Sequence, residues 1–167
     1  MDAVVRLAAE TGTGQSMHEM RSYMDTNVTG TVVLLEARVQ RRIDKIVLSS
    51  SRAMYAEGMW ECANCGPVHP SLPPSDSGQT PDWAPLCPEC ETPVAGLLPT
   101  PEDAPMDPVS VYGISKLAQE LLVSGVQKAY PADVSILRFF LDWAASQPHG
   151  DRYEQSPSEI RERGLYR

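Results

Sequence analysis

The chain has 167 residues, of which 42% are hydrophobic and 22% are charged, and this composition is typical of a folded globular protein. Its formal net charge of -8 argues against binding to a nucleic acid backbone, which requires clustered cations. We expect no membrane span and a cytoplasmic location, because no apolar stretch approaches ~18 residues and the first residues lack a secretory signal.

The first predicted elements are a strand and a long helix. Ala3 to Ala9 is a short apolar segment that predicts a buried strand ending in small residues. From Ser16 to Gln40, apolar residues recur every three or four positions, which predicts an amphipathic helix that packs in the core or against a partner helix. This stripe consists of Met17, Met20, Met24, Val28, Val32, Leu35 and Val39. Four basic residues near the end of the helix are expected to be solvated there: Arg38, Arg41, Arg42 and Lys45.

A second strand, Lys45 to Ser49, leads into the serines Ser49-Ser50-Ser51. Residues 56–108 then change character, because prolines cluster and aliphatic periodicity disappears, so we interpret them as an insertion. Periodicity returns in a helix from the N-cap Ser110 to about Lys128. Its predicted buried face consists of Ile114, Leu117, Leu121 and Leu122. A third strand follows over Val134 to Phe139.

This alternation predicts an α/β fold with a parallel sheet covered by helices. We divide the chain into a core domain of residues 1–55 and 109–140, an insertion of residues 56–108 and a divergent C-terminal tail of residues 141–167. In open parallel sheets, chemistry gathers at the carboxyl ends of the strands. Ala8-Ala9 and Ser49-Ser50-Ser51 both lie at such ends.

Tyr112 and Lys116 carry the strongest chemical signal in the core domain. Four residues apart on a helix, they lie on the same face, one turn apart. An ammonium beside a phenol favours the phenolate, which makes the tyrosine a general base for a sugar or alcohol hydroxyl. A serine at the end of a neighbouring strand can hold the same substrate oxygen. The alternative is an ordinary surface tyrosine and lysine, since this spacing is common.

The insertion contains four cysteines in two Cys-x-x-Cys pairs, Cys62 with Cys65 and Cys87 with Cys90. Each pair directs two sulfurs at one point, and two pairs complete a tetrahedral site, so we expect a closed, structural Zn²⁺ site. The alternatives are two redox pairs or reduced free thiols. A catalytic dithiol usually sits at the start of a helix, whereas these pairs lie in a proline-rich segment, which disfavours redox chemistry.

Four segments also occur in a recognisable order and spacing. They are Leu7-Ala8-Ala9, Asn27-Val28-Thr29-Gly30-Thr31, Ser49-Ser50-Ser51-Arg52-Ala53-Met54-Tyr55 and Tyr112-Gly113-Ile114-Ser115-Lys116. Together they resemble the extended short-chain dehydrogenase/reductases, and most closely the NAD-dependent nucleotide-sugar epimerases. The resemblance covers residues 2–139 and implies a partial Rossmann-type domain.

The resemblance implies a catalytic set in which Ser51 binds substrate, Tyr112 is the base, and Lys116 activates the base and holds the nicotinamide ribose. It implies an NAD site lined by Ala8, Ala9, Thr26, Ser49, Tyr112 and Lys116. In such epimerases the tyrosine deprotonates the sugar 4-hydroxyl while NAD accepts hydride from C4. Related dehydratases usually carry acidic residues after the active-site serine or threonine, whereas Arg52 and Ala53 follow Ser51 here, which favours epimerase-like or simple oxidoreductase chemistry.

The sequence departs from the family at both ends. It has no Gly-x-x-Gly-x-x-Gly turn for the cofactor pyrophosphate, and Thr11-Gly12-Thr13-Gly14 follows a different strand. The substrate domain expected after Phe139 is also missing, so we expect a chain truncated at both ends. Two hypotheses follow: an epimerase-like enzyme, or a catalytically inactive fragment that serves as a zinc-stapled interaction or oligomerisation module.

The resemblance further implies a nucleotide-sugar substrate and a homodimer formed through helices 16–40 and 110–128. It also implies that a strand of the family's sheet is absent beside residues 3–9. We therefore expect these residues to form an exposed apolar edge that is prone to pairing.

Overall fold

The computed structural model describes residues 3–70 and 85–139, which form two compact units. The first unit contains residues 3–54 and 108–139, and the second contains residues 55–70 and 85–107. The tail predicted over residues 141–167 lies outside the described residues. No helix in the described ranges is long and apolar enough to cross a membrane.

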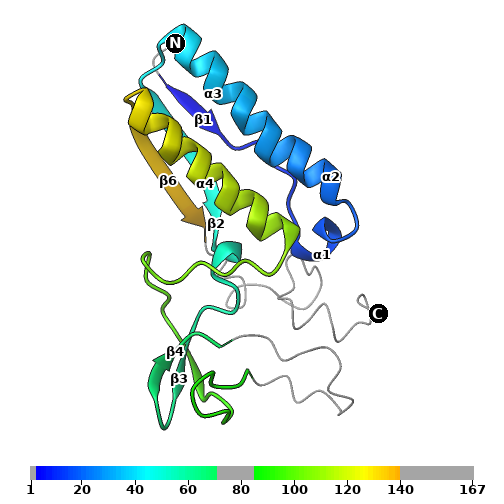
Figure 1. Ribbon diagram of the computed structural model, residues 1–167, viewed down its shortest axis with the longest axis vertical. Coiled ribbons are helices and arrows are strands. Elements are labelled where there is room, and N and C mark those ends of the chain that lie inside the picture. The colour runs from blue at the N-terminus through cyan, green and yellow to red at the C-terminus, as the bar shows by residue number, and fades with distance from the viewer. Residues whose placement is uncertain (1–2, 71–84, 140–167) are drawn as a thin grey trace, which may run out of the picture. The chain divides into compact units, whose positions relative to one another are not determined.

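The first unit is built on a three-stranded parallel sheet in the order β1-β2-β6 (Figure 1). The strands are β1 (Val4–Arg6), β2 (Lys45–Ser51) and β6 (Asp133–Phe139). The strand predicted over Ala3 to Ala9 is therefore shorter, because its pairing with β2 ends where Arg6 lies opposite Leu48. The α/β class and the parallel sheet predicted from the sequence are confirmed.

Two helices, α3 (Gly30–Arg41) and α4 (Val111–Ala129), lie side by side over one face of this sheet (Figure 1). Alternate residues of β2 point toward them, so Ile46 and Leu48 are buried. With Leu35 of α3 and Val123 of α4 they form the core. Burial of such side chains stabilises the fold by about 1.5–3 kcal/mol each.

The single helix predicted from Ser16 to Gln40 is wrong at its start. Instead α1 (Thr13–Ser16) is one turn, α2 (Met20–Tyr23) begins after a break, and a π-helical segment, η1 (Met24–Thr29), leads into α3. The helix is interrupted at Glu19, whose φ of -115° and ψ of 37° are not helical. Asn27 lies within the π-helical turn and is completely buried.

The predicted buried face of α4 is wrong at two of its four positions, since Leu117 and Leu122 are half-buried and Leu122 packs against the core. Ile114 is 47% exposed and Leu121 is 65% exposed, whereas the buried side is largely polar. It consists of Tyr112, Gly113, Ser115, Lys116, Gln119, Glu120 and Val123. Hydrogen bonds to η1, α3, β2 and β6 compensate the burial of these polar groups, as the following sections describe.

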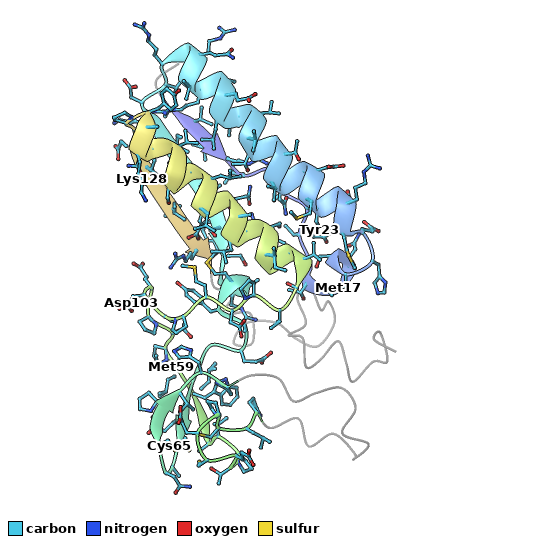
Figure 2. All side chains as sticks on the ribbon, viewed as in Figure 1. Met17, Tyr23, Met59, Cys65, Asp103 and Lys128 are labelled. Carbon is cyan, nitrogen blue, oxygen red and sulfur yellow. The ribbon has the colours of Figure 1, made fainter. Side chains whose placement is uncertain are left out.

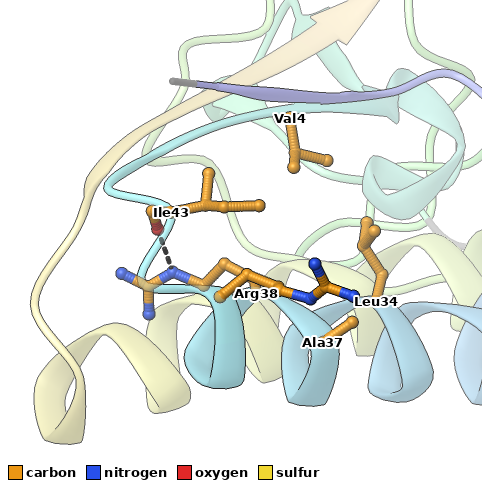
Figure 3. Close-up of a pocket in the computed structure, with 6 residues that line it drawn as sticks. Val4, Leu34, Ala37, Arg38 and Ile43 are labelled. Atoms are coloured by element: carbon orange, nitrogen blue, oxygen red, sulfur yellow. Dashed lines mark hydrogen bonds between the residues drawn. The ribbon is translucent and has the colours of Figure 1, made fainter. Parts of the chain in front are cut away.

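Arg38, expected to be solvated, is buried and acts as a structural clamp at the end of α3. Its guanidinium donates hydrogen bonds to the carbonyls of Ile43 (2.7 Å), Tyr130 (2.9 Å) and Pro131 (2.7 Å). Figure 3 shows the first of these bonds beside a hollow of about 480 Å³. The hollow lies at the amino ends of the strands, where Val4 begins β1 and Ile43 precedes β2. It is therefore at the opposite end of the sheet from the predicted chemistry.

The second unit contains a small antiparallel sheet in the order β4-β3-β5. Its strands are β3 (Met59–Cys62), β4 (Gly66–Val68) and β5 (Gly96–Leu98). A 3₁₀ turn, η2 (Arg52–Tyr55), follows β2 at the junction of the two units. The buried cluster of the second unit is formed by Cys62, Val68, Cys87 and Val94.

Candidate active site

Tyr112, Lys116 and the serines of β2 meet at the carboxyl end of the sheet. The Lys116 ammonium donates a hydrogen bond to the Ser49 carbonyl at 2.9 Å and lies 5.8 Å from the centre of the Tyr112 ring. Tyr112, Lys116 and Ser51 are all buried, with at most 7% of each residue exposed. The structure therefore brings Lys116 together with Tyr112 and the Ser49 carbonyl, and Ser51 ends the same strand as Ser49. Because Tyr112 and Lys116 are buried, the ordinary-surface interpretation of the pair does not hold.

Gly113 explains how Tyr112 reaches the end of β2. A Cβ at this position would lie 2.5 Å from the carbonyl oxygen of Ala53, two residues after Ser51. Only glycine permits this close approach of backbone to backbone. The Ser110 side chain accepts a hydrogen bond from the Gly113 amide at 3.0 Å, so the predicted N-cap is observed and fixes the start of α4 at the same place.

Ser51 is the last residue of β2, and a hydrogen bond orients its hydroxyl group. The hydroxyl oxygen accepts a hydrogen bond from the Ala53 amide at 3.2 Å, which leaves the hydroxyl proton to donate to another acceptor. Ser50 is buried beside it, and its hydroxyl has no hydrogen-bond partner within the described part of the chain.

Lys116 is a buried cation in a cationic environment. Burial, and secondarily the charge of Arg6, lower the pKa of Lys116 to about 8. Burial also lowers the pKa of Arg6, whose guanidinium donates a hydrogen bond to the Thr26 carbonyl at 2.7 Å. A lysine with a pKa near 8 is a readily exchanged proton donor at neutral pH.

Tyr23 lines the other side of the Tyr112 ring. The two rings meet edge to face with their centres 6.3 Å apart, and the Tyr23 hydroxyl donates a hydrogen bond to the Thr11 carbonyl. Burial, followed by the charges of Glu10 and Glu19, raises the pKa of Tyr23. Tyr23 therefore remains a neutral hydrogen-bond donor and orienting group rather than a second base.

Asn27 supplies a positioning network that the sequence reasoning did not identify as part of the site. Its amide nitrogen donates to the Ser115 hydroxyl (2.8 Å) and to the Glu10 carbonyl (3.0 Å), and its oxygen accepts from the Glu10 amide (2.9 Å). Ser115 in turn donates to the Tyr112 carbonyl at 2.8 Å. The signal was the asparagine within Asn27-Val28-Thr29-Gly30-Thr31, a polar residue inside an apolar helical pattern.

The remaining residues predicted to line a cofactor site lie at or near the end of β1 and in η1. Ala8 is exposed and Ala9 is half-buried, directly beyond the carboxyl end of β1. Thr26 lies in η1, and its carbonyl holds Arg6. Thr11 and Gly12 are committed to local structure, since their carbonyls accept from Tyr23 and from the Ser16 amide.

The four cysteines converge in the second unit. Their sulfur atoms all lie within 4.8 Å of one another, and Cys65 lies in the turn between β3 and β4 (Figure 2). Such a group is chemically able to hold a metal ion.

Comparison with known proteins supports one family. Residues 1–73 match the model of the NAD dependent epimerase/dehydratase family. The chain is 37% identical over 140 residues to dTDP-L-rhamnose 4-epimerase of Burkholderia thailandensis, covering 82% of this chain and 37% of that protein. It is 30% identical over 142 residues to UDP-glucose 4-epimerase of Neisseria meningitidis serogroup C, covering 84% and 31%.

Solved structures give the same result. UDP-glucose 4-epimerase from Brucella ovis in complex with NAD superposes with a TM-score of 0.58 at 26% identity, covering 83% of this chain and 31% of that one. The chain spans about a third of the length of the relatives that it matches. Its parallel sheet and covering helices agree with their Rossmann-type architecture. These matches support the assignment of this chain to the NAD dependent epimerase/dehydratase family.

Proposed function

We propose that this chain carries the proton-transfer half of an NAD-dependent nucleotide-sugar epimerase. The observation that carries the proposal is the buried group of Ser51, Tyr112 and Lys116 at the carboxyl end of β2. The relatives named above act as 4-epimerases of dTDP- and UDP-sugars, which supports a nucleotide sugar as the substrate. No observation within the described residues favours the alternative of an inactive interaction module.

The side chains divide the proton chemistry between them. Tyr112, as phenolate, accepts the proton of the sugar 4-hydroxyl, and the neighbouring Lys116 ammonium stabilises the negative charge on the phenol oxygen. Ser51 donates its hydroxyl proton to the same sugar oxygen and so holds it in position. NAD, when bound, supplies the acceptor for the hydride that leaves C4. In the return step Tyr112 would donate its proton back to the sugar 4-oxygen, which completes the part of the inversion that this chain's own residues perform.

The residues present fit part of this cofactor. Lys116 uses one of its three N–H donors on Ser49, and the others would bind the hydroxyls of a ribose. The small side chains of Ala8 and Ala9 beyond β1 allow a flat ring system to approach the backbone. The pyrophosphate is a different matter, because it needs backbone N–H donors at the start of a helix and α1, the helix that follows β1, is a single turn.

A calorimetric titration of NAD into the full 167-residue chain tests the proposal. We expect saturable binding at millimolar NAD or below, and slow interconversion of dTDP-L-rhamnose or UDP-glucose with its 4-epimer. Tyr112→Phe should retain NAD affinity within about twofold and lose turnover by at least ~100-fold, because it removes only the base. Lys116→Ala should weaken NAD binding as well as turnover.

The two variants also serve as controls for each other. Equal loss of NAD affinity in both would contradict the separate roles of base and ribose ligand. Absence of NAD binding to the wild-type chain at millimolar cofactor would contradict the proposal itself, because the proposed reaction has no hydride acceptor without it.

A further inference from the structure

We infer that the second unit binds one Zn²⁺ ion through Cys62, Cys65, Cys87 and Cys90, and that this ion replaces most of the missing apolar core of the unit. The inference concerns a different unit from the proposed active site and is independent of the epimerase reaction. It rests on four observations: the sulfur geometry, the backbone of the two turns, the composition of the core and the hydrogen bonds to sulfur.

The sulfur geometry matches a tetrahedral tetrathiolate site. Four sulfurs about 2.3 Å from one zinc ion lie about 3.8 Å from each other. The four cysteine sulfurs here are all within 4.8 Å of one another, and those of Cys62 and Cys90 are 3.5 Å apart. The sulfurs of both Cys-x-x-Cys pairs therefore converge on one point, whereas two independent redox dithiols require no such convergence.

Both turns have the backbone of a metal-binding loop. Cys62 ends β3 and Gly66 begins β4 with a φ of 78°, so the first pair turns the hairpin. The second pair closes with hydrogen bonds from the Glu91 amide to the Cys87 carbonyl and from the Cys87 amide to the Thr92 carbonyl, both 2.9 Å. Glu91 has a φ of 58°, a left-handed conformation that is unfavourable for a glutamate and persists only where the surroundings require it.

None of the four cysteines lies in a helix. Thiols that perform redox chemistry are usually activated at the amino end of a helix, and that arrangement is missing around this group. The backbone thus favours a closed, structural shell in which all four positions are protein ligands and none is open to water.

Within the described residues, the apolar core of the unit is too small to support folding by apolar burial alone. Its buried cluster contains two valines, Val68 and Val94, and the two ligands Cys62 and Cys87, with Trp60 and Cys90 packed against them. The three strands have only four, three and three residues. Small units of this kind usually depend on a metal or disulfides, and metal binding then supplies folding free energy.

Polar groups around the sulfurs complete the site. The Thr92 hydroxyl lies 3.0 Å from the Cys90 sulfur and 3.7 Å from the Cys62 sulfur, and the Asn64 amide donates to Cys90 at 3.9 Å. A zinc-bound thiolate accepts hydrogen bonds and cannot donate them, so both groups act as donors that offset the negative charge of four thiolates. Thr92 is a positioning residue in this sense.

Elemental analysis and cobalt substitution of the full chain test the inference. Protein purified without chelator should contain one zinc ion per chain. After exchange, Co²⁺ should give the intense visible bands of a tetrahedral thiolate complex. Cys65→Ser removes an exposed ligand with little change in packing, and should weaken Co²⁺ binding by at least ~10-fold. Ala63→Ser, an exposed non-ligand position in the same turn, should retain one metal ion.

A second measurement keeps the inference testable if Cys65→Ser fails to fold. In wild-type protein, addition of a strong chelator should accelerate amide exchange in β3, β4 and β5 and leave β2 and α4 unchanged. Thr92→Val should retain zinc but lose it to chelator about tenfold faster. Less than half an equivalent of zinc with no cobalt spectrum, iron in place of zinc, or unchanged exchange on chelation would each overturn the inference.

Discussion

Gly113 is the residue on which the proposed site depends most directly. Alanine there would place a methyl group 2.5 Å from the Ala53 carbonyl and 3.1 Å from Pro108, so the start of α4 must move away from the end of β2. We expect Gly113→Ala to destabilise the chain by about 1–3 kcal/mol. It should also reduce turnover by more than its effect on stability explains, because Tyr112 moves with the helix.

Gly125 provides a matched control in the same helix. A Cβ at Gly125 meets nothing within 4 Å, and alanine is the better helix former. Gly125→Ala should therefore stabilise the chain by about 0.5–1 kcal/mol in urea unfolding. Equal effects of the two substitutions would contradict a specific close approach at Gly113.

The lowered pKa of Lys116 predicts that the stability of the chain depends on pH. The pKa falls from 10.5 to about 8 on folding, mainly through burial. Between these values the unfolded chain binds more protons than the folded chain, so the free energy of unfolding increases with pH through this interval. Relative to Lys116→Met, which has no such group, the wild type should gain stability as pH rises from about 8 to 10. A constant difference between the two proteins across that range would contradict the burial of a charged Lys116.

At the scale of residues, the sequence predicted which residues lie one helical turn apart, but it did not predict hydrogen bonds between side chains distant in the sequence. The four-residue interval between Tyr112 and Lys116 and the N-cap role of Ser110 follow from helical geometry. The role of Asn27 does not, because its partners Glu10 and Ser115 come from segments 17 and 88 residues away. Side-chain hydrogen bonds over such distances depend on tertiary packing, which a single sequence pattern does not contain.

The elements of the first unit are joined by an ion pair between the half-buried Arg138 of β6 and the buried Glu120 of α4. Arg138 donates from Nε and Nη2 to both carboxylate oxygens of Glu120, with a shortest distance of 2.7 Å. Glu120→Ala removes charge-assisted hydrogen bonds to the half-buried Arg138 guanidinium, and each such bond contributes about 1.5–3 kcal/mol. We expect Glu120→Ala to destabilise the chain by about 3 kcal/mol.

An exposed pair in the same unit serves as the comparison. Arg21 and Asp25 are one helical turn apart at 3.3 Å, with side chains 94% and 62% exposed. Asp25→Ala should cost at most about 0.5 kcal/mol, because water screens this pair. Chemical denaturation of both variants measures the difference, and similar losses would show that Glu120 and Arg138 are not coupled as the structure indicates.

The elements themselves were more predictable than the faces that they bury. Periodicity correctly placed β2, β6 and α4 within one or two residues of their bounds. It assigned Ile114 and Leu121 to the buried face because they are apolar, whereas burial of Lys116, Gln119 and Glu120 is compensated by hydrogen bonds from neighbouring elements. The break before Met20 was missed for a similar reason, since the apolar stripe continues through a backbone that is not helical at Glu19.

At the scale of the whole molecule, both edge strands of the sheet in the first unit, β1 and β6, are open within the described residues. β1 pairs only with β2, and Val5 of β1 and Leu7 directly after it are 58% and 69% exposed. β2, in contrast, is paired on both sides. In this chain, amides of β1 should exchange at least ~10-fold faster than those of β2 in a mass-spectrometric exchange experiment. Equal protection of the two strands would show that another segment or chain covers the edge.

The outer side of the helices in the first unit predicts self-association. Ile114 and Leu121 of α4 are exposed, as are Met20, Met24 and Val33 of the preceding helical segments. A groove of about 500 Å³ runs between α3 and α4 and is lined by Val32, Leu35, Glu36, Val39, Gln40, Leu122, Val126 and Tyr130. A two-fold dimer buries the same apolar surface on both copies, so one face of this kind is sufficient.

A single charge tests this proposed dimer. We expect the wild-type chain to sediment as a dimer at micromolar concentration and Leu121→Glu to sediment as a monomer, because each dimer would otherwise bury two glutamates. Leu97→Glu is the control, since Leu97 is equally exposed at 68% but lies on β5 of the second unit. A monomeric wild type, or dimers in both variants, would contradict an interface through α4. Dissociation by Leu97→Glu alone would instead assign the contact to the second unit.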